Sequence, residues 1–190
     1  MTPKVVFLAA ALLAAPAAAQ PVGQPPSYTG DLTGFSGNPQ ALPRAITALE
    51  HQGAQVMEIR YDGSKGPGYA VVLARAGQVE FDRAAEPVAG VTVITSSTEP
   101  AWMLGWRGRA ELKAARKAKV DLATAVRSAE KDANGAAVAA GIAQSAANPT
   151  SDVKAYNVLV RTASGRLQRV AIDADTGARI QNPDALRKWP

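Results

Sequence analysis

The chain has 190 residues, a formal net charge of +5 and no cysteine. Because cysteine is absent, the sequence excludes disulfides, thiolate metal sites and a lipid-anchored cysteine. His51 is the one histidine, so a histidine-based zinc site cannot form within one chain, and a Ser-His-Asp arrangement would have to use this residue. His51 falls in the last turn of a predicted helix, where a partly charged imidazole suits the negative end of the helix dipole.

Residues 1–19 have the pattern of a signal peptide. Lys4 gives a positive start, an apolar run extends from Val5 to Ala15, and small residues precede the expected cleavage point at Ala19. This run is too short to cross a bilayer, which takes about 20 residues. We therefore expect a soluble periplasmic or secreted protein, for which the basic net charge does not indicate nucleic acid as a partner.

Residues 20–40 are predicted to form a disordered leader. Prolines and glycines recur through this segment, which forbids a helix and disfavours paired strands. A helix is expected next, because Leu42, Ile46 and Leu49 have the i, i+4, i+7 spacing of one buried face. Gly53 is placed to end that helix.

Strands are expected after this helix. Apolar residues alternate with charged ones over 57–61, which predicts a half-buried strand. Residues 69–74 are apolar on both faces, as in a central strand. A glycine turn leads to a second alternating segment over 79–82, and one more strand is expected over 91–95. Together with the helix, these strands make a first unit over 41–99.

Residues 100–118 are expected to connect this unit to a second one. Two of the three tryptophans lie close together here, beside a cluster of cations. Aromatic residues next to arginine are typical of binding hot spots, and tryptophan beside basic residues is also typical of proteins that lie on anionic membranes. Two structural interpretations stay open: the tryptophans fix the connector onto the domains, and the cations form a solvated helix face. The candidate partner-binding residues are Trp102, Trp106, Arg107, Arg109, Lys113 and Arg116.

The second unit is expected over 119–190. Asp121 is placed as an N-cap before apolar residues with helical spacing, and Asn134 is placed to stop that helix. The small residues over 136–146 predict a weak strand or a loop. Two strands around a glycine turn follow, over 156–161 and 167–173.

The order helix, strand, Tyr-led strand, glycine turn, strand thus occurs twice. Tyr69 and Tyr156 begin the matching strands, where both are interpreted as half-buried aromatics. We infer an internal duplication. The expected fold class is α+β, with two small units that each pack a helix on an antiparallel sheet.

The second unit resembles the PepSY domain, a small extracytoplasmic α+β module. The first half matches less closely, because Asp82-Arg-Ala-Ala replaces the closing Asp-x-x-x-Gly. The resemblance implies a binding or inhibitory role, such as restraint of a thermolysin-type peptidase. It rests on Val120-Asp-Leu-Ala-Thr-Ala125, Tyr156-Asn-Val, Gly165 and Val170-Ala-Ile-Asp-Ala-Asp-Thr-Gly177.

Aspartates near the C-terminus suggest two further chemistries. Asp175-Thr-Gly-Ala178 is the tetrapeptide of retroviral aspartic proteases, but their chemistry needs two facing aspartates and a long following segment. We interpret it as a turn whose aspartates cap backbone amides. Asp173, Asp175 and Asp184 also have the spacing of calcium-loop positions 1, 3 and 12, although Ala178 stands where such a loop needs glycine. A looser calcium contact at this turn stays open.

The sequence favours a non-catalytic protein without cofactor or metal. The expected function is protein binding in the cell envelope, and the PepSY resemblance implies that the partner is a peptidase that is modulated or inhibited. A groove or sheet edge would hold an extended segment of the partner. The alternative is a peripheral adaptor that docks through the connector to an anionic membrane surface or an acidic partner. The identity of the partner and the oligomeric state do not follow from the sequence.

Cleavage after Ala19 is the first testable prediction. The small-x-small site ends there, and Pro21 disfavours a later cut. The intact mass of the exported protein should therefore correspond to a chain that begins at Gln20. An exported chain that keeps Met1 would contradict both the signal peptide and the expected location.

Overall fold

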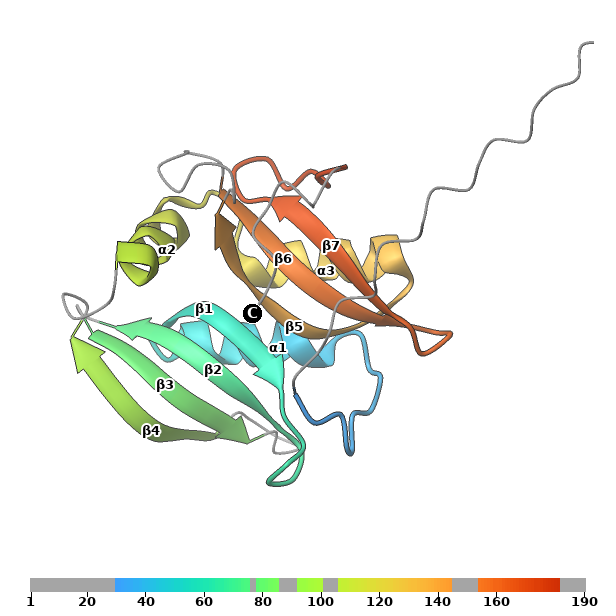
Figure 1. The fold of residues 1–190 in the computed structure, drawn as a ribbon, viewed down its shortest axis with the longest axis horizontal. Helices are drawn as coiled ribbons and strands as arrows, with labels where there is room; N and C mark the ends of the chain where they lie inside the picture. The colour runs from blue at the N-terminus through green and yellow to red at the C-terminus, as the bar shows by residue number, and fades with distance from the viewer. Residues whose placement is uncertain (1–29, 76–77, 86–91, 101–105, 145–153, 182–190) are drawn as a thin grey trace, which may run out of the picture.

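The computed structural model describes residues 30–75, 78–85, 92–100, 106–144 and 154–181. Within them the chain forms three helices and one sheet of seven strands (Figure 1). This confirms the expected α+β class with helices on an antiparallel sheet. The helices are α1 (Ala41–His51), α2 (Trp106–Lys117) and α3 (Leu122–Ala133). The strands are β1 (Gln55–Tyr61), β2 (Gly68–Arg75), β3 (Gln78–Ala85), β4 (Thr92–Pro100), β5 (Gly135–Gln144), β6 (Lys154–Thr162) and β7 (Leu167–Asp173).

The strands are ordered β4-β3-β2-β1-β5-β6-β7, and all neighbouring pairs are antiparallel. β1 and β5 meet in the middle of the sheet, where Ile59 pairs with Ala140 and one further pair lies on each side. The two expected units therefore do not have separate sheets. They share one, and the segment of small residues that was expected to be a weak strand or a loop is its central strand β5.

The two halves of the sheet have matching geometry. Each half runs from a helix into three consecutive antiparallel strands, to which the first half adds β4, and the first strand of each half carries a register shift. The shift brackets Met57 in β1 and Val138 in β5, each two residues before the central Ile59–Ala140 pair. An extra residue at this point bends a strand and increases its twist. Both strands thus bend at equivalent distances from the joint.

Two helices cover one face of the sheet and the third lies on the other. Figure 1 shows α1 and α3 side by side behind the strands, where they contact each other and enclose the main core. Tyr69 and Tyr156 are both buried in this core, more fully than the half-burial expected of these strand aromatics. α2 packs on the opposite face, where Leu112 joins Met57 and Val79 in a second, smaller cluster.

Local signals account for the bounds of α3. The Asp121 carboxylate accepts a hydrogen bond from the Thr124 amide at 2.6 Å, which is the expected N-cap and contributes about 1 kcal/mol. At the other end Asn134 adopts a left-handed conformation with φ of 48°. Asparagine tolerates this conformation better than most residues, so the helix ends there and the chain turns directly into β5.

The expected disorder of the leader over 20–40 is wrong for its last ten residues. Phe35 packs edge-on against Tyr61 with ring centroids 5.2 Å apart, and the Tyr61 hydroxyl donates to the Thr33 carbonyl at 2.9 Å. The Gly63 amide donates to the Asp31 carbonyl at 2.7 Å. Proline and glycine prevent regular structure here but do not prevent packing, because side chains of the core supply the contacts. Residues 1–29, including the expected signal peptide, lie outside the described part of the chain.

Val158 provides a test of the core. Its side chain is fully buried on β6 beneath the helices, so Val158→Asp would place a charge there without a partner. We expect a loss of several kcal/mol in the free energy of unfolding, measured by denaturant titration. The control is Arg166→Asp in the exposed turn before β7, which should change stability by less than about 0.5 kcal/mol. A similarly small change in stability for Val158→Asp would contradict the burial of Val158 in the core.

Candidate functional site

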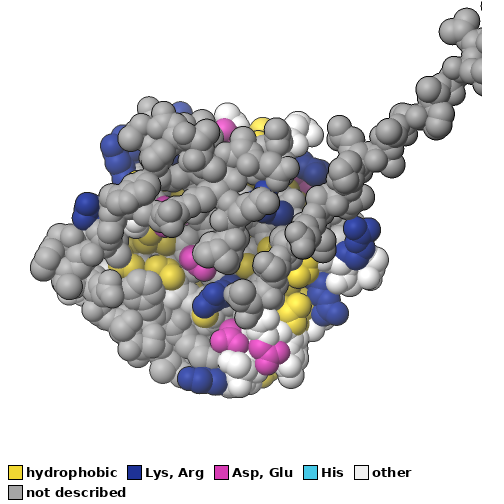
Figure 2. Space-filling model, viewed as in Figure 1, with side chains coloured by type: hydrophobic (Ala, Val, Ile, Leu, Met, Phe, Trp, Pro, Cys, Tyr) yellow, Lys and Arg dark blue, Asp and Glu magenta, His cyan; other side chains and the backbone are white. Residues whose placement is uncertain are grey.

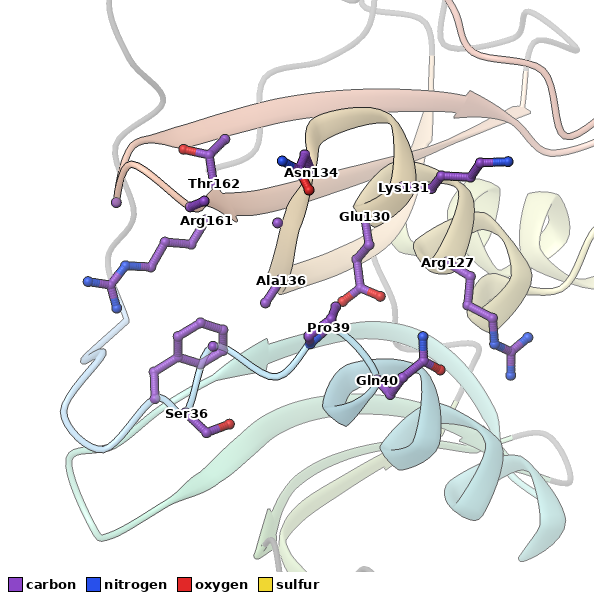
Figure 3. Close-up of a pocket in the computed structure, with 15 residues that line it drawn as sticks. Ser36, Pro39, Gln40, Arg127, Glu130, Lys131, Asn134, Ala136, Arg161 and Thr162 are labelled. Atoms are coloured by element: carbon purple, nitrogen blue, oxygen red, sulfur yellow. The ribbon is translucent and has the colours of Figure 1, made fainter.

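A pocket opens where the end of α3 meets the start of α1. Its volume is about 650 Å³, which is within the range of small-molecule and peptide side-chain sites. Four segments line it: residues 35–40 before α1, the last turns of α3, the start of β5, and residues 161–165 at the end of β6. Figure 3 shows these segments around the opening. Every lining residue belongs to the described part of the chain.

Glu130 is the buried acid of this pocket. Its side chain is on α3 and the residue is only 4% exposed. Oε1 accepts a hydrogen bond from the Ala137 amide at 2.9 Å, whereas Oε2 is buried and has no hydrogen-bond partner among the described residues. Burial raises the pKa of Glu130 to about 7, although the Ala137 amide and the Arg127 charge oppose the shift. Near neutral pH this carboxyl therefore exchanges between its protonated and charged forms.

The mouth of the pocket is positive. Arg127 and Lys131 on α3 and Arg161 on β6 line it, and all three residues are exposed. Figure 3 shows the Arg127 and Arg161 side chains on opposite sides of Glu130. The Lys131 side chain is directed away from Glu130 in the same view. With an arginine on each side of one carboxyl that is often neutral, the local field attracts anions.

An apolar wall stands beside these charges. Phe35, Pro39 and Ala136 line the pocket, and Phe35 is held by its packing against Tyr61. The pocket thus offers an apolar surface, a positive mouth and one buried polar group. Such a combination is typical of sites that bind an organic molecule and fix its orientation.

The backbone of β5 sets the geometry of the pocket. β1 pairs with β5 only from Ala139 to Gly141, and the Ala137 amide, just before that stretch, takes Glu130 as its acceptor. Gly135 is needed where β5 begins, because a Cβ there would collide with the carbonyl of Arg161. This close approach holds the start of β5 against the end of β6, so the pocket wall is made of backbone as well as side chains.

Five of the six predicted partner-binding residues lie on α2, which packs on the other face of the sheet. Arg109, Lys113 and Arg116 are exposed and follow the spacing of one helix face, while Leu112 and Ala115 are buried. Figure 2 shows Lys and Arg side chains at the left edge of the molecule, where Figure 1 places α2. Trp106 and Arg107 begin α2, but their side chains are not among the described ones, and Trp102 lies outside the described residues.

The aspartate turn has the expected structural role. Asp173 Oδ1 accepts the amides of Asp175 at 2.9 Å and Thr176 at 2.8 Å, and Gly177 has a φ of 73°. Asp175 forms an ion pair with Lys154 at 3.1 Å, while Asp184 lies outside the described residues. Within the part of the chain that the structure describes, no three His, Asp or Glu side chains are placed to hold a metal ion.

Sequence reasoning missed both the pocket and Glu130. The one sequence signal was a charged residue between buried alanines of the helical stripe, since Ala129 and Ala133 flank Glu130 on the core side of α3. Such a position is ambiguous, because a glutamate next to a core stripe more often reaches solvent. The fold decides the outcome by bringing the start of β5 and residues 35–40 over this side chain.

Comparisons with known proteins add little. No protein-family model matches the chain, and no curated protein matches it. A solved structure of a "putative lipoprotein" from Clostridium difficile 630 is similar to it with a TM-score of 0.40 and 15% identity, over 76% of this chain and 88% of that chain. A likeness this distant carries no argument about function. Of the helices that the structure describes, none is long and apolar enough to cross a membrane.

Glu130 should make stability depend on pH. A carboxyl whose pKa is about 7 when folded and near 4.5 when unfolded stabilises the fold below pH 4.5, and this contribution is lost as the pH rises through 7. We expect the free energy of unfolding to fall by roughly 2 to 3 kcal/mol between pH 5 and pH 8. Glu130→Gln should weaken this dependence, because an amide does not ionise.

Denaturant titrations at both pH values measure the effect. Asp132→Asn is the matched control, since Asp132 is an exposed carboxylate on the same helix. It should behave as the unmodified protein does. An unchanged pH dependence in Glu130→Gln would show that Glu130 is ionised alike in the folded and unfolded chains.

Proposed function

We propose that the chain is a non-catalytic binding module that acts outside the cytoplasm and holds a segment of a partner protein in the pocket at the end of α3. The observation that carries this proposal is the combination of a positive mouth, an apolar wall and a buried carboxyl in one opening. The signal-peptide pattern of residues 1–19 supports export. The PepSY resemblance favours a peptidase as the partner, with modulation or inhibition as the result of binding.

Glu130 is better placed to hold a ligand than to perform acid–base chemistry. A general acid or base acts on a reacting group within hydrogen-bond reach, and a second polar group commonly orients it. Among the described residues, Glu130 has the Ala137 amide as its hydrogen-bond partner, and the residue is 4% exposed. The Ala137 amide therefore fixes the orientation of the carboxyl beside the pocket, which suits recognition.

A second candidate function rests on α2. Arg109, Lys113 and Arg116 form an exposed basic face, held in place by the burial of Leu112 against the sheet. This geometry would suit an adaptor that docks on an anionic membrane surface or on an acidic protein. The pocket and the α2 face lie on opposite sides of the sheet, so one can be changed without disturbing the other.

Two charge-reversal variants separate these functions. We would select binders for the mature chain from a displayed library of random peptides and measure their affinities by fluorescence anisotropy. Reversing Arg127 and Arg161 to Glu should weaken the selected peptides about tenfold or more. Reversing Arg109, Lys113 and Arg116 to Glu should leave them unchanged. Thermal stability should be nearly unaffected in both variants, because exposed charges contribute less than about 1 kcal/mol each.

Vesicles that contain an anionic lipid provide the opposing measurement. One outcome is that the chain binds the vesicles, selects no peptides, and loses vesicle binding when the three α2 residues are reversed. The adaptor function would then be supported in place of peptide binding in the pocket. If the affinity of the selected peptides is unchanged when Arg127 and Arg161 are reversed, the pocket is not where a partner binds.

A further inference from the structure

We propose that the pocket recognises a carboxylate, and that Glu130 donates a hydrogen bond to it through Oε2. The group that fits is the C-terminal carboxylate of a polypeptide with an apolar last side chain. This inference rests on the proposed function and names the chemistry of its ligand.

The hydrogen bonds of Glu130 decide its role in recognition. Oε1 is already used by the Ala137 amide, so a proton on the carboxyl is carried by Oε2. That oxygen is closed to water in this structure and has no partner among the described residues, so the Glu130 side chain must turn toward the opening for a ligand to reach it. A buried donor without an acceptor is unfavourable, and a ligand oxygen would satisfy it. Because the pKa is about 7, the donor is present in slightly acidic and neutral solution.

The surrounding charges favour an anionic acceptor. Arg127 and Lys131 come from α3 and Arg161 from β6, whereas the residues that the segment 35–40 and β5 contribute to the pocket are uncharged. One oxygen of a carboxylate could accept from Glu130 while the other faces a guanidinium, whose planar fork suits carboxylates. A cationic or neutral group at the same place would gain nothing from the two arginines.

The apolar wall distinguishes a carboxylate from other anions. Phe35, Pro39 and Ala136 stand next to the charged groups, and Figure 3 shows the Glu130 carboxyl directed toward Pro39. A C-terminal residue carries its apolar side chain and its carboxylate on the same Cα atom, so both parts can be held together. Inorganic phosphate has no apolar part and would leave this wall exposed to water.

Blocked peptides provide the test. N-acetyl tripeptides that end in leucine, valine or phenylalanine would be compared as free acids and as C-terminal amides by isothermal titration calorimetry. At pH 6 the acids should bind the unmodified protein at least tenfold more tightly than the amides. Raising the pH to 8 should weaken the acids about tenfold, because Glu130 loses its proton. In Glu130→Gln the side-chain NH₂ donates at every pH. The affinity of this variant for the acids should therefore agree within about twofold between pH 6 and pH 8.

Each alternative outcome is distinct. Equal affinity for acids and amides would overturn carboxylate recognition and leave the proposed function standing, since the pocket would still hold peptides. If neither the acids nor the amides bind at millimolar concentration, carboxylate recognition and the proposed function are both overturned. Displacement of the acids by inorganic phosphate as readily as by acetate would show a general anion site and overturn the selectivity. A Glu130→Gln variant that keeps the pH dependence would assign the donor to another residue, and Asp132→Asn is the control that should behave as the unmodified protein.

Discussion

The short contact between β1 and β5 is the joint on which the structure depends. β1 and β5 pair only around Ile59 and Ala140, with one neighbouring pair on each side, so backbone hydrogen bonds alone hold the halves weakly. The helices above complete the joint, because α1 and α3 contact each other and both lie over the same core. The small side chains of Ala137 and Ala140 let this helix layer approach the middle of the sheet. Any shift at the joint would move α3 against α1 and change the pocket between their ends.

A tyrosine fixes the chain segment that precedes each of these two helices. Tyr156 donates to the Val120 carbonyl at 2.9 Å, and Tyr61 donates to the Thr33 carbonyl at the same distance. Val120 immediately precedes the N-cap of α3, so that end of the helix pair is closed tightly, and the Val120 amide is further tied to the Ala174 carbonyl. Thr33 lies several residues before α1. The segment between Thr33 and α1 is therefore longer than the one between Val120 and α3. Its residues line the pocket at the opposite end of the helix pair.

Local patterns predicted the parts of the fold whose causes are local. The N-cap at Asp121, the stop at Asn134 and the turn at Asp173 follow from side chains that bond within a few residues or from their own backbone preference. Alternation predicted the strands over 57–61 and 79–82, and a run that is apolar on both faces predicted the strand between them. β5 was uncertain because alanine and glycine have low strand propensity, and its pairing on both sides overrides that preference. The joining of the halves, the packing of Phe35 and the burial of Glu130 depend on contacts between distant segments. No window of sequence contains them, so these features required the structure.

The two ends of the helix pair differ in the sign of their charge, although each has a glutamate near the end of a helix. At one end lies Glu50, whose pKa is raised by burial and by the nearby Asp121 carboxylate. At the other end lies Glu130, whose pKa is raised by burial and opposed by Arg127. An anion that approaches the Glu50 end meets a second negative group, whereas one that approaches the Glu130 end meets arginines. The pair of helices thus has one end that repels anions and one that attracts them.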